Sequence, residues 1–191
     1  MASKDMASKE TASTSIDTYL RENRRLEYGL LRQFAKQASL ADFTQVVDHA
    51  VLVGSGVYSG MLEEDRQSDQ TMMFNKRYID QDDDAEISLN SAIFYLHAKG
   101  AHGNVITIGR AEANDLMLND TPISREHAQI RVADDQYFLT DLGGTNGTML
   151  NEQQMPAQKE VELQPGDNIG FGRYQFNFMT PERFYKWVHK Y

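Results

Sequence analysis

The chain has 191 residues, a formal net charge of −9 and no cysteine. Its apolar content of 40% and charged content of 25% are those of a globular protein, and its length suits one domain with an extension or two small domains. The lack of cysteine excludes disulfides, thiolate metal sites and cysteine nucleophiles, and the acidic balance argues against general nucleic-acid binding.

The acidic residues are concentrated in the middle of the chain. Residues 61–90 hold nine acidic and three basic residues, whereas residues 1–60 hold seven of each. Any site for an anionic ligand must therefore be built locally, from a few basic side chains brought together by the fold.

The sequence contains no segment with the composition of a membrane anchor or a signal peptide. The longest weakly polar run, residues 46–62, contains Asp48, His49 and several glycines, and residues 1–15 lack an apolar core. We expect a cytoplasmic protein without a membrane partner.

The N-terminal part of the sequence predicts a tail followed by helices. Small and polar residues fill positions 1–15, which predicts a disordered tail. Apolar residues recur at helical spacing over residues 17–38, and again over 39–51 with a serine or aspartate placed as N-cap. We predict a helical hairpin over residues 16–54. Because it is too small to bury a core alone, it must pack on the rest of the chain, on a second copy or on a partner.

Glycines punctuate residues 54–60, and no lysine follows them as a phosphate-binding loop requires. We therefore predict a connector at this point and a flexible acidic linker over residues 55–88. The linker contains one small apolar stretch, from Thr71 to Phe74.

After residue 91 apolar and polar residues alternate in short runs, which turn residues separate. This pattern predicts an antiparallel β-sandwich over residues 89–180, and hence a mainly β fold class with an N-terminal helical extension. The expected strands are residues 92–97, 104–109, 128–132, 136–142, 168–172 and 174–179.

The last segment, residues 181–191, returns to helical spacing. Thr180 stands at the N-cap position, Pro181 at the first helical position, and four apolar residues form one stripe. We expect this short helix to pack on the sandwich rather than to bind a partner.

The segment TPISREHA, residues 121–128, allows two interpretations. Ser124 and His127 have the residue types of a nucleophile and its base, whereas Ser124 and Arg125 have those of an anion-binding loop. The catalytic interpretation lacks an acid partner for His127, and we expect Arg125 to lower the pKa of that imidazole. We therefore favour the anion-binding loop. The other histidines show no metal-ligand spacing, so we expect no metal site, and we predict no cofactor.

Four fragments at the loops of the expected sandwich occur in the order and spacing of a known family. They are IGR at 108–110, SREH at 124–127, GGTNGT at 143–148 and LQPGDNIGFG at 163–172. Together they resemble the forkhead-associated (FHA) domain, a module that binds phosphothreonine peptides, over about residues 90–180. The resemblance implies a β-sandwich with a phosphopeptide-binding site in its loops.

The resemblance also implies roles for individual residues. Arg110, Ser124 and Arg125 are expected to bind the phosphate, whose charge of about −1.5 to −2 suits cationic and hydroxyl donors. Thr145 would contact the phosphate and the threonine methyl group, and Asn146 would hold the peptide main chain. The implied loop-shaping residues are Gly109, His127 and Gly147. Taken singly, Arg110 is equally a solvated surface arginine and Ser124 a turn residue.

Two positions depart from the pattern of the family. Pro122 stands two residues before Ser124, where family members that select an acidic peptide residue can carry a basic side chain. We therefore expect a preference for an apolar residue three positions after the phosphothreonine. Asn151–Glu152 stands where an asparagine–glycine turn is common, which leaves the hairpin shape there open.

Thr71 is the candidate phosphorylation site of the linker, with acidic residues before it and Met72, Met73 and Phe74 after it. It is similar to the threonine that small bacterial regulators of the family present to their own FHA domain, although those carry a pair of threonines. A linker of about twenty residues spans about 25 Å, comparable with a small domain. The alternative is that this apolar stretch packs on the sandwich.

We favour a non-enzymatic adaptor for phosphothreonine proteins, downstream of a serine/threonine kinase, with Thr71 as a point of regulation and self-association through the N-terminal helices as an option. The alternative is a structural subunit of a larger assembly, such as a secretion apparatus, which packs through the FHA domain and the N-terminal helices. An enzyme ranks last because the sequence offers no paired carboxylates, metal cluster or activated nucleophile.

Overall fold

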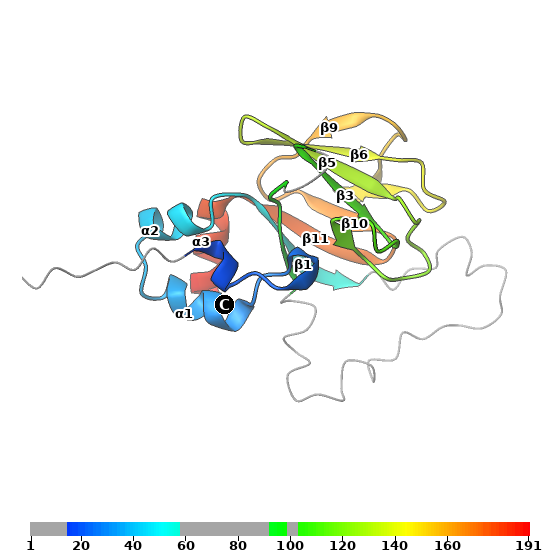
Figure 1. The fold of residues 1–191 in the computed structure, drawn as a ribbon. Coiled ribbons are helices and arrows are strands. Elements are labelled where there is room, and N and C mark those ends of the chain that lie inside the picture. Colours follow the sequence, from blue (N-terminus) through cyan, green and yellow to red (C-terminus); the bar gives the residue numbers. More distant parts are fainter. Residues whose placement is uncertain (1–14, 58–91, 99–102) are drawn as a thin grey trace, which may run out of the picture.

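The computed structural model describes residues 15–57, 92–98 and 103–191. The predicted tail, apart from Ser15, and most of the predicted linker, including Thr71, therefore lie outside the described residues. Within them two β-sheets pack face to face, and helices cover the outer face of one sheet (Figure 1).

The two sheets confirm the predicted mainly β sandwich. One has the strand order β2-β1-β11-β10-β7-β8 and the other β4-β3-β5-β6-β9. The pairing is antiparallel throughout these sheets except between β3 and β4. The strands are β1 (Val51–Val57), β2 (Ile93–Tyr95), β3 (Val105–Gly109), β4 (Leu116–Met117), β5 (Ala128–Ala133), β6 (Gln136–Asp141), β7 (Thr148–Leu150), β8 (Gln153–Gln154), β9 (Glu160–Glu162), β10 (Asn168–Phe171) and β11 (Tyr174–Met179).

Apolar side chains from both sheets fill the space between them. Strand alternation directs Ile106 and Ile108 of β3 into this core, and both are fully buried. Full burial of one such side chain stabilises the fold by about 1.5–3 kcal/mol. Further members of the sandwich core are Leu52, Phe94, Ile130, Leu139, Ile169, Phe171, Phe176 and Phe178.

A second apolar core lies on the outer face of the sheet that contains β1, β2 and β11. Phe43 is fully buried in this core and contacts the rings of Phe184 and Tyr185. The predicted hairpin therefore packs on the rest of its own chain, and the predicted C-terminal helix joins it (Figure 1). The elements of this layer are the 3₁₀ turns η1 (Ile16–Thr18) and η2 (Glu22–Arg24) and the helices α1 (Tyr28–Ala35), α2 (Leu40–Val46) and α3 (Pro181–Lys190).

Strand β1 corrects our predictions for the end of the hairpin and the start of the linker. The sequence AVLVGSGV suggested the end of a helix and a connector, but residues 51–57 form a strand that pairs with β11 and β2. Leu52 belongs to the sandwich core, whereas Val51 and Val53 belong to the helical core. A strand buried on both faces shows no polar alternation, so its short apolar run resembles part of a helix.

The first predicted helix, over residues 17–38, is also shorter than expected. Its α-helical part is confined to Tyr28–Ala35, because Asn23 and Arg24 adopt left-handed backbone angles, with φ of 55° at both residues. The helix after it begins at the N-cap Ser39. None of the helices in the described ranges is long and apolar enough to span a membrane.

The turn between β7 and β8 forms without a glycine. Asn151 and Glu152 have φ of 50° and 67°, the left-handed pair that a two-residue hairpin turn favours, and Met149 pairs with Gln154 across it. The hairpin is therefore retained despite the departure from asparagine–glycine. The strands β4, β7, β8 and β9 were not predicted, because runs of two or three residues are too short to show a period.

Candidate functional site

Three loops lie at the same end of the sandwich and carry the predicted binding residues. The first loop, residues 110–115, joins β3 to β4; the second, residues 118–127, joins β4 to β5; the third, residues 142–147, joins β6 to β7. The register places the end of β3 and the end of β6 beside the start of β5, so the three loops are neighbours.

Main-chain hydrogen bonds fix the first loop against the second. The Arg110 N–H donates to the Ser124 carbonyl at 2.9 Å, and the Ala111 N–H donates to the Arg125 carbonyl at 3.1 Å. The Arg110 Nε–H adds a bond to the Ile123 carbonyl at 3.2 Å. The backbones of the three predicted phosphate ligands therefore lie directly beside one another.

Gly109 makes this close approach sterically feasible. A Cβ at this position would overlap the Arg125 carbonyl oxygen and lie 2.9 Å from both its carbonyl carbon and the Asn114 Nδ2. The Asn114 Nδ2 donates to the carbonyls of Ala111 at 2.8 Å and Arg125 at 2.7 Å. The position of Gly109 is thus consistent with the predicted role in shaping the loops. The role of Asn114 had no local signal in the sequence.

His127 is buried beneath the loops and connects the second loop to the third. Its Nδ1 accepts a hydrogen bond from the Ser124 N–H at 3.2 Å, and its Nε2–H donates to the Gly147 carbonyl at 3.1 Å. Both ring nitrogens are engaged by main-chain groups, which requires the neutral Nε2–H tautomer. The ring is hydrogen-bonded to the Ser124 main-chain N–H and not to the Ser124 hydroxyl, so the geometry does not support a nucleophile and base.

Burial lowers the pKa of His127, while the nearby Asp141 carboxylate and the Gly147 carbonyl oppose the shift. We had expected Arg125 to lower this pKa. The direction agrees with that expectation, but the physical cause is the removal of the ring from water.

Asp141 and Gly144 hold the third loop, and neither was among the predicted residues. The buried Asp141 carboxylate accepts hydrogen bonds from the Gly143 N–H at 2.8 Å and the Thr148 hydroxyl at 2.6 Å. A Cβ at Gly144 would lie 2.7 Å from the Ser124 Oγ, so this loop passes directly over the serine hydroxyl. The doubled glycine in GGTNGT was the sequence signal for this approach.

Asn146 ties the third loop to the second. Its Nδ2 donates to the Pro122 carbonyl at 2.9 Å, which leaves its side-chain oxygen and second amide hydrogen without a partner in the described part of the chain. Gly147, with φ of 64°, closes the turn by donating its N–H to the Gly144 carbonyl at 3.0 Å.

The rim of the three loops presents donors to solvent. The side chains of Arg110, Arg125 and Thr145 are exposed, and those of Ser124 and Asn146 are half-buried. Within the described residues, Arg110 and Arg125 form no ion pair. The Arg110 side chain donates one hydrogen bond, and the Arg125 side chain makes none to these residues. Two cations beside hydroxyl and amide groups, with no carboxylate paired to them, suit an anionic ligand.

The five predicted binding residues are thus brought together, while Thr71 lies outside the described residues. In residues 15–57, 92–98 and 103–191, histidine, aspartate and glutamate side chains form no group of three or more that could hold a metal ion.

Lowering the pH is expected to destabilise the protein through His127. Because its folded-state pKa lies below the ordinary value of 6.5, the unfolded state binds the proton more readily, and the free energy of unfolding falls as the pH drops below 6.5. We expect His127→Gln, which does not titrate, to lose this part of the dependence. Thermal unfolding from about pH 5 to 8 measures it. Parallel pH profiles for the two proteins contradict the assignment.

Comparison with known proteins matches this region to one family. Residues 106–172 match the family model of the FHA domain. The oxoglutarate dehydrogenase inhibitor of Corynebacterium efficiens is 36% identical over 74 residues, which are 39% of this chain and 50% of that protein. The glycogen accumulation regulator GarA of Mycobacterium tuberculosis is 32% identical over 76 residues, 40% of this chain and 45% of GarA.

Among solved structures, the FHA domain of FhaA, crystallised in a complex, is 30% identical with a TM-score of 0.40, and the match covers 46% of this chain and 88% of that one. The chain spans about half the length of the curated relatives it matches.

Proposed function

Residues 106–172 form an FHA domain, and from this premise we propose that the chain is a non-catalytic adaptor that binds phosphothreonine in partner proteins. The observation that carries the proposal is the group of solvent-facing donors on three loops at one end of the sandwich. Arg110 and Arg125 supply two permanent positive charges, and Ser124 supplies a hydroxyl, for a phosphate that carries about −1.5 to −2 charges.

The loops need little ordering when they bind. The bonds from Arg110 to Ser124, from Asn146 to Pro122 and through His127 already hold them in one arrangement. Preorganised donors lose less conformational entropy on binding, so more of the interaction energy appears as affinity.

Thr145 and Asn146 complete the proposed site. Thr145 is exposed and is proposed to contact both the phosphate and the threonine methyl group. Asn146 keeps an amide hydrogen and its carbonyl oxygen for the main chain of the bound peptide, since its other amide hydrogen is used by Pro122.

The second loop supports a preference for an apolar residue three positions after the phosphothreonine. Pro122 carries no charge. The nearby Arg173 forms a two-bond ion pair with Asp120, both distances being 2.6 Å, so its charge is balanced within the chain. An acidic peptide side chain at this position would therefore add little binding free energy. An apolar side chain can contact Pro122 without removing a charge from water.

The names of two relatives favour a regulatory role. One is named as an inhibitor of oxoglutarate dehydrogenase and the other as a regulator of glycogen accumulation. For this chain we propose the corresponding general role, an adaptor in the cytoplasm whose partners are phosphorylated by a serine/threonine kinase.

We further propose that phosphorylated Thr71 occupies the binding site of its own chain. Strand β1 ends at Val57, which pairs with Tyr174, and the adjacent Arg173 contacts the second loop through Asp120. Thr71 lies fourteen positions after Val57, and a chain of fourteen residue steps reaches at most about 50 Å, so the chain length permits capture. A tethered ligand has an effective concentration of about 1 mM.

Self-capture predicts that phosphorylation of Thr71 weakens the binding of an external phosphothreonine peptide. The measurement compares the peptide's Kd for the phosphorylated chain and for a Thr71→Ala variant treated with the same kinase. We expect the phosphorylated chain to bind at least about tenfold more weakly. Equal affinities would end this part of the proposal and leave the adaptor function standing.

A pull-down tests the adaptor function itself. Wild-type protein and Arg110→Ala are used as bait in cell extract, with and without phosphatase treatment. Capture that requires both Arg110 and phosphate supports the adaptor. Capture that is indifferent to both, but is lost on replacing the exposed Leu30 of α1, supports instead a structural subunit that assembles through its helices.

A further inference from the structure

The N-terminal arm, residues 19–27, contains a strained turn that lies against the FHA domain. Asn23 and Arg24 both have φ of 55°, a left-handed conformation that glycine adopts freely and that is unfavourable for a residue with a side chain such as that of Arg24. Such conformations persist where surrounding contacts over-determine them, and they are common at functional sites. The contacts of these two side chains therefore indicate what the turn does.

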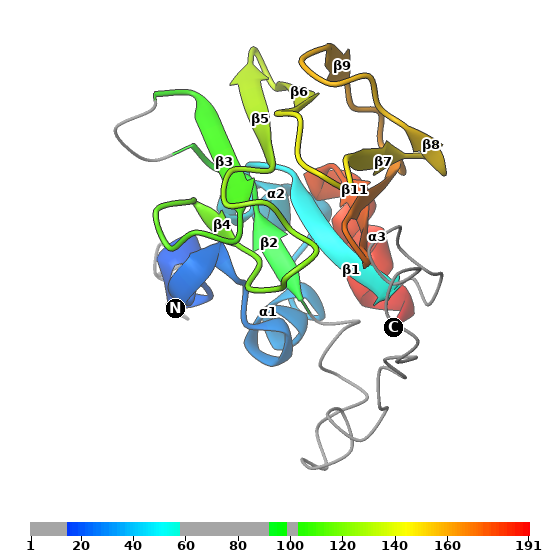
Figure 2. The same cartoon turned by 90° about the vertical axis from the view of Figure 1, so that its right-hand side faces the viewer.

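Asn23 pairs with the free edge of β4. Its Nδ2 donates to the Met117 carbonyl at 2.8 Å, and its Oδ1 accepts from the Met117 N–H at 2.6 Å. β4 is an edge strand of only two residues, and the asparagine amide takes the place that a neighbouring strand would occupy. Figure 2 shows the blue N-terminal segment beside β4, in agreement with the contacts between η2 and β4.

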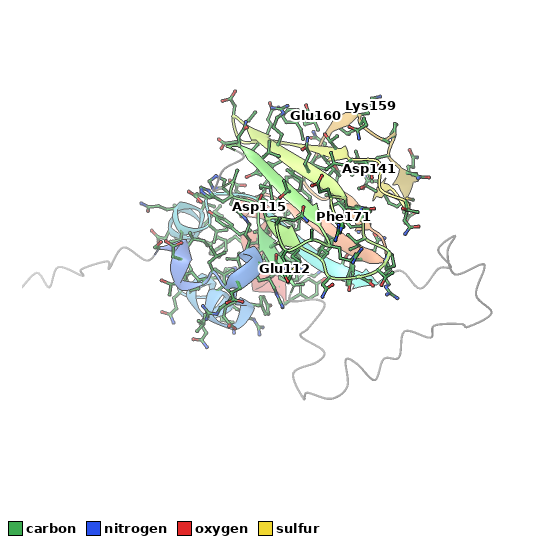
Figure 3. All side chains as sticks on the ribbon, turned by 45° about the vertical axis from the view of Figure 1, so that its right-hand side comes forward. Glu112, Asp115, Asp141, Lys159, Glu160 and Phe171 are labelled. Atoms are coloured by element: carbon green, nitrogen blue, oxygen red, sulfur yellow. The ribbon has the colours of Figure 1, made fainter. Side chains whose placement is uncertain are left out.

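Arg24 anchors the residue just before β4. Its guanidinium donates to the Asp115 carboxylate at 2.6 Å and also to the His97 carbonyl, and the two charged side chains are only 15% and 18% exposed. The other carboxylate oxygen of Asp115 accepts two hydrogen bonds, from the Thr107 N–H at 3.0 Å and from the Thr107 hydroxyl at 3.1 Å. Asp115 lies on the side of the sandwich that faces the N-terminal layer (Figure 3).

The groups around Asp115 keep its carboxylate ionised, and hence keep this anchor charged. Burial alone would raise its pKa, but the hydrogen bonds from Thr107 and the hydrogen bond and charge of Arg24 outweigh burial and lower the pKa. Asp115 is therefore ionised at neutral pH, and removing Arg24 would leave a mostly buried carboxylate without its cation.

Strand β4 separates the first loop, with Arg110, from the second loop, with Ser124 and Arg125. The parallel pairing of β4 with the end of β3 fixes the position of the last residues of the first loop. The hydrogen bond from the Leu118 N–H to the Gly109 carbonyl, at 3.0 Å, fixes the position of the first residue of the second loop. Any shift of β4 is thus passed to both sets of phosphate donors.

We propose that Asn23 and Arg24 are positioning residues, which clamp β4 and thereby hold the two loops in the geometry that binds phosphothreonine. This inference rests on the proposed function and extends it, because it places part of the determinants of affinity in the N-terminal arm, outside the FHA domain. The arm then gives the N-terminal layer a direct mechanical connection to the binding site.

The test is the double variant Asn23→Gly/Arg24→Gly in the full chain. Glycine adopts φ of 55° without strain, so the variant removes the clamp and keeps the path of the backbone. Arg21→Ala is the matched control, since it removes the same charge from the same arm, where Arg21 is half-exposed and bridges to Glu27 at 3.5 Å. Circular dichroism shows whether the variants are folded, and the Kd for a phosphothreonine peptide is then measured well below the unfolding temperature.

We expect the double variant to bind about 3- to 30-fold more weakly and Arg21→Ala to bind like wild type. The single variant Arg24→Lys keeps a cation beside Asp115, so it should bind much more tightly than the double variant and nearly as tightly as wild type. A folded double variant that is less stable but binds like wild type overturns the proposal, because a purely structural contact changes the stability and leaves the Kd of the folded protein unaltered. If the double variant does not fold, Asn23→Asp, which cannot donate to Met117, carries the same test.

Amide hydrogen exchange separates this inference from the proposed function. The N–H groups of Arg110 and Ala111 donate across the two loops, so they should exchange faster in the double variant, while the N–H of Leu139 in β6 should not change. If the wild-type protein binds no phosphopeptide, the proposed function is wrong. The exchange rates of the Arg110 and Ala111 N–H groups then still show whether Asn23 and Arg24 hold the two loops. Unchanged protection at Arg110 and Ala111 overturns the clamp whatever the peptide results.

Discussion

Replacing Arg110 by alanine is expected to weaken phosphothreonine-peptide binding by about 100-fold. The guanidinium forms no ion pair with the described residues, and charge-assisted hydrogen bonds to a phosphate contribute about 1.5–3 kcal/mol each. Arg110 is exposed and donates one side-chain hydrogen bond within the described residues, to the Ile123 carbonyl, so we expect the unfolding temperature to change much less than the affinity. Isothermal titration calorimetry and thermal unfolding measure the two quantities.

Two further variants control for charge and for shape. Arg183→Ala removes an equal charge from α3, where the arginine donates to Pro165, and should bind peptide like wild type. Arg110→Lys keeps the charge but loses the planar fork, so we expect an affinity between those of wild type and Arg110→Ala. If all three variants bind alike, the phosphate does not lie against Arg110.

Replacing Gly109 by alanine is expected to destabilise the protein by about 3 kcal/mol and to displace the second loop. The new methyl group would overlap the Arg125 carbonyl oxygen, which belongs to the main chain and cannot rotate away as a flexible side chain would. For a chain of this length we expect the unfolding temperature to fall by about 6–12 °C. Peptide binding should weaken as well, because Arg125 and Ser124 must move to admit the methyl group.

The same substitution at Gly29 is the control. Gly29 lies in α1, and a Cβ there would meet only the Glu27 Oε1, at 3.6 Å. Alanine has the higher helix propensity by about 1 kcal/mol, so Gly29→Ala should leave the stability unchanged or raise it. A Gly109→Ala protein that is as stable as Gly29→Ala would contradict the close packing described for the first two loops.

The grouping of the five residues of the proposed binding site could be predicted from the sequence, because these residues occur in short contiguous motifs. SREH places Ser124, Arg125 and His127 on one loop, and the GR and TN pairs place Arg110 and Asn146 on two others. The strands that hold these loops alternate in the usual way, since each has one face on the sandwich core. Local pattern and three-dimensional arrangement therefore agree in this part of the chain.

The supporting roles of Asn114, Asp141 and Asn23 could not be predicted, because they depend on which groups the fold brings beside these side chains. Asn114 acts through the Arg125 carbonyl, and Asp141 acts through both ends of the third loop. Asn23 meets Met117, 94 positions along the chain. An isolated asparagine or aspartate in a polar segment reads as a turn residue, and only the fold shows what it contacts.

Strand β1 shows a different limit of prediction from a local sequence pattern. Val51, Leu52 and Val53 are fully buried because the sandwich covers one face and the helical layer covers the other. The helical layer is itself assembled from both ends of the chain, α1 and α2 with α3. A local pattern therefore could not show that this apolar run lies between two cores.

The proposed function requires above all that the three loops distinguish a phosphorylated threonine from an unmodified one. The decisive measurement is a binding titration of the full chain against pairs of peptides that differ only in phosphorylation of a single threonine. We predict that the phosphorylated member of at least one pair binds at least about 100-fold more tightly, and that added salt weakens this preference. If no phosphorylated peptide binds more tightly than its unmodified counterpart, the central claim is wrong.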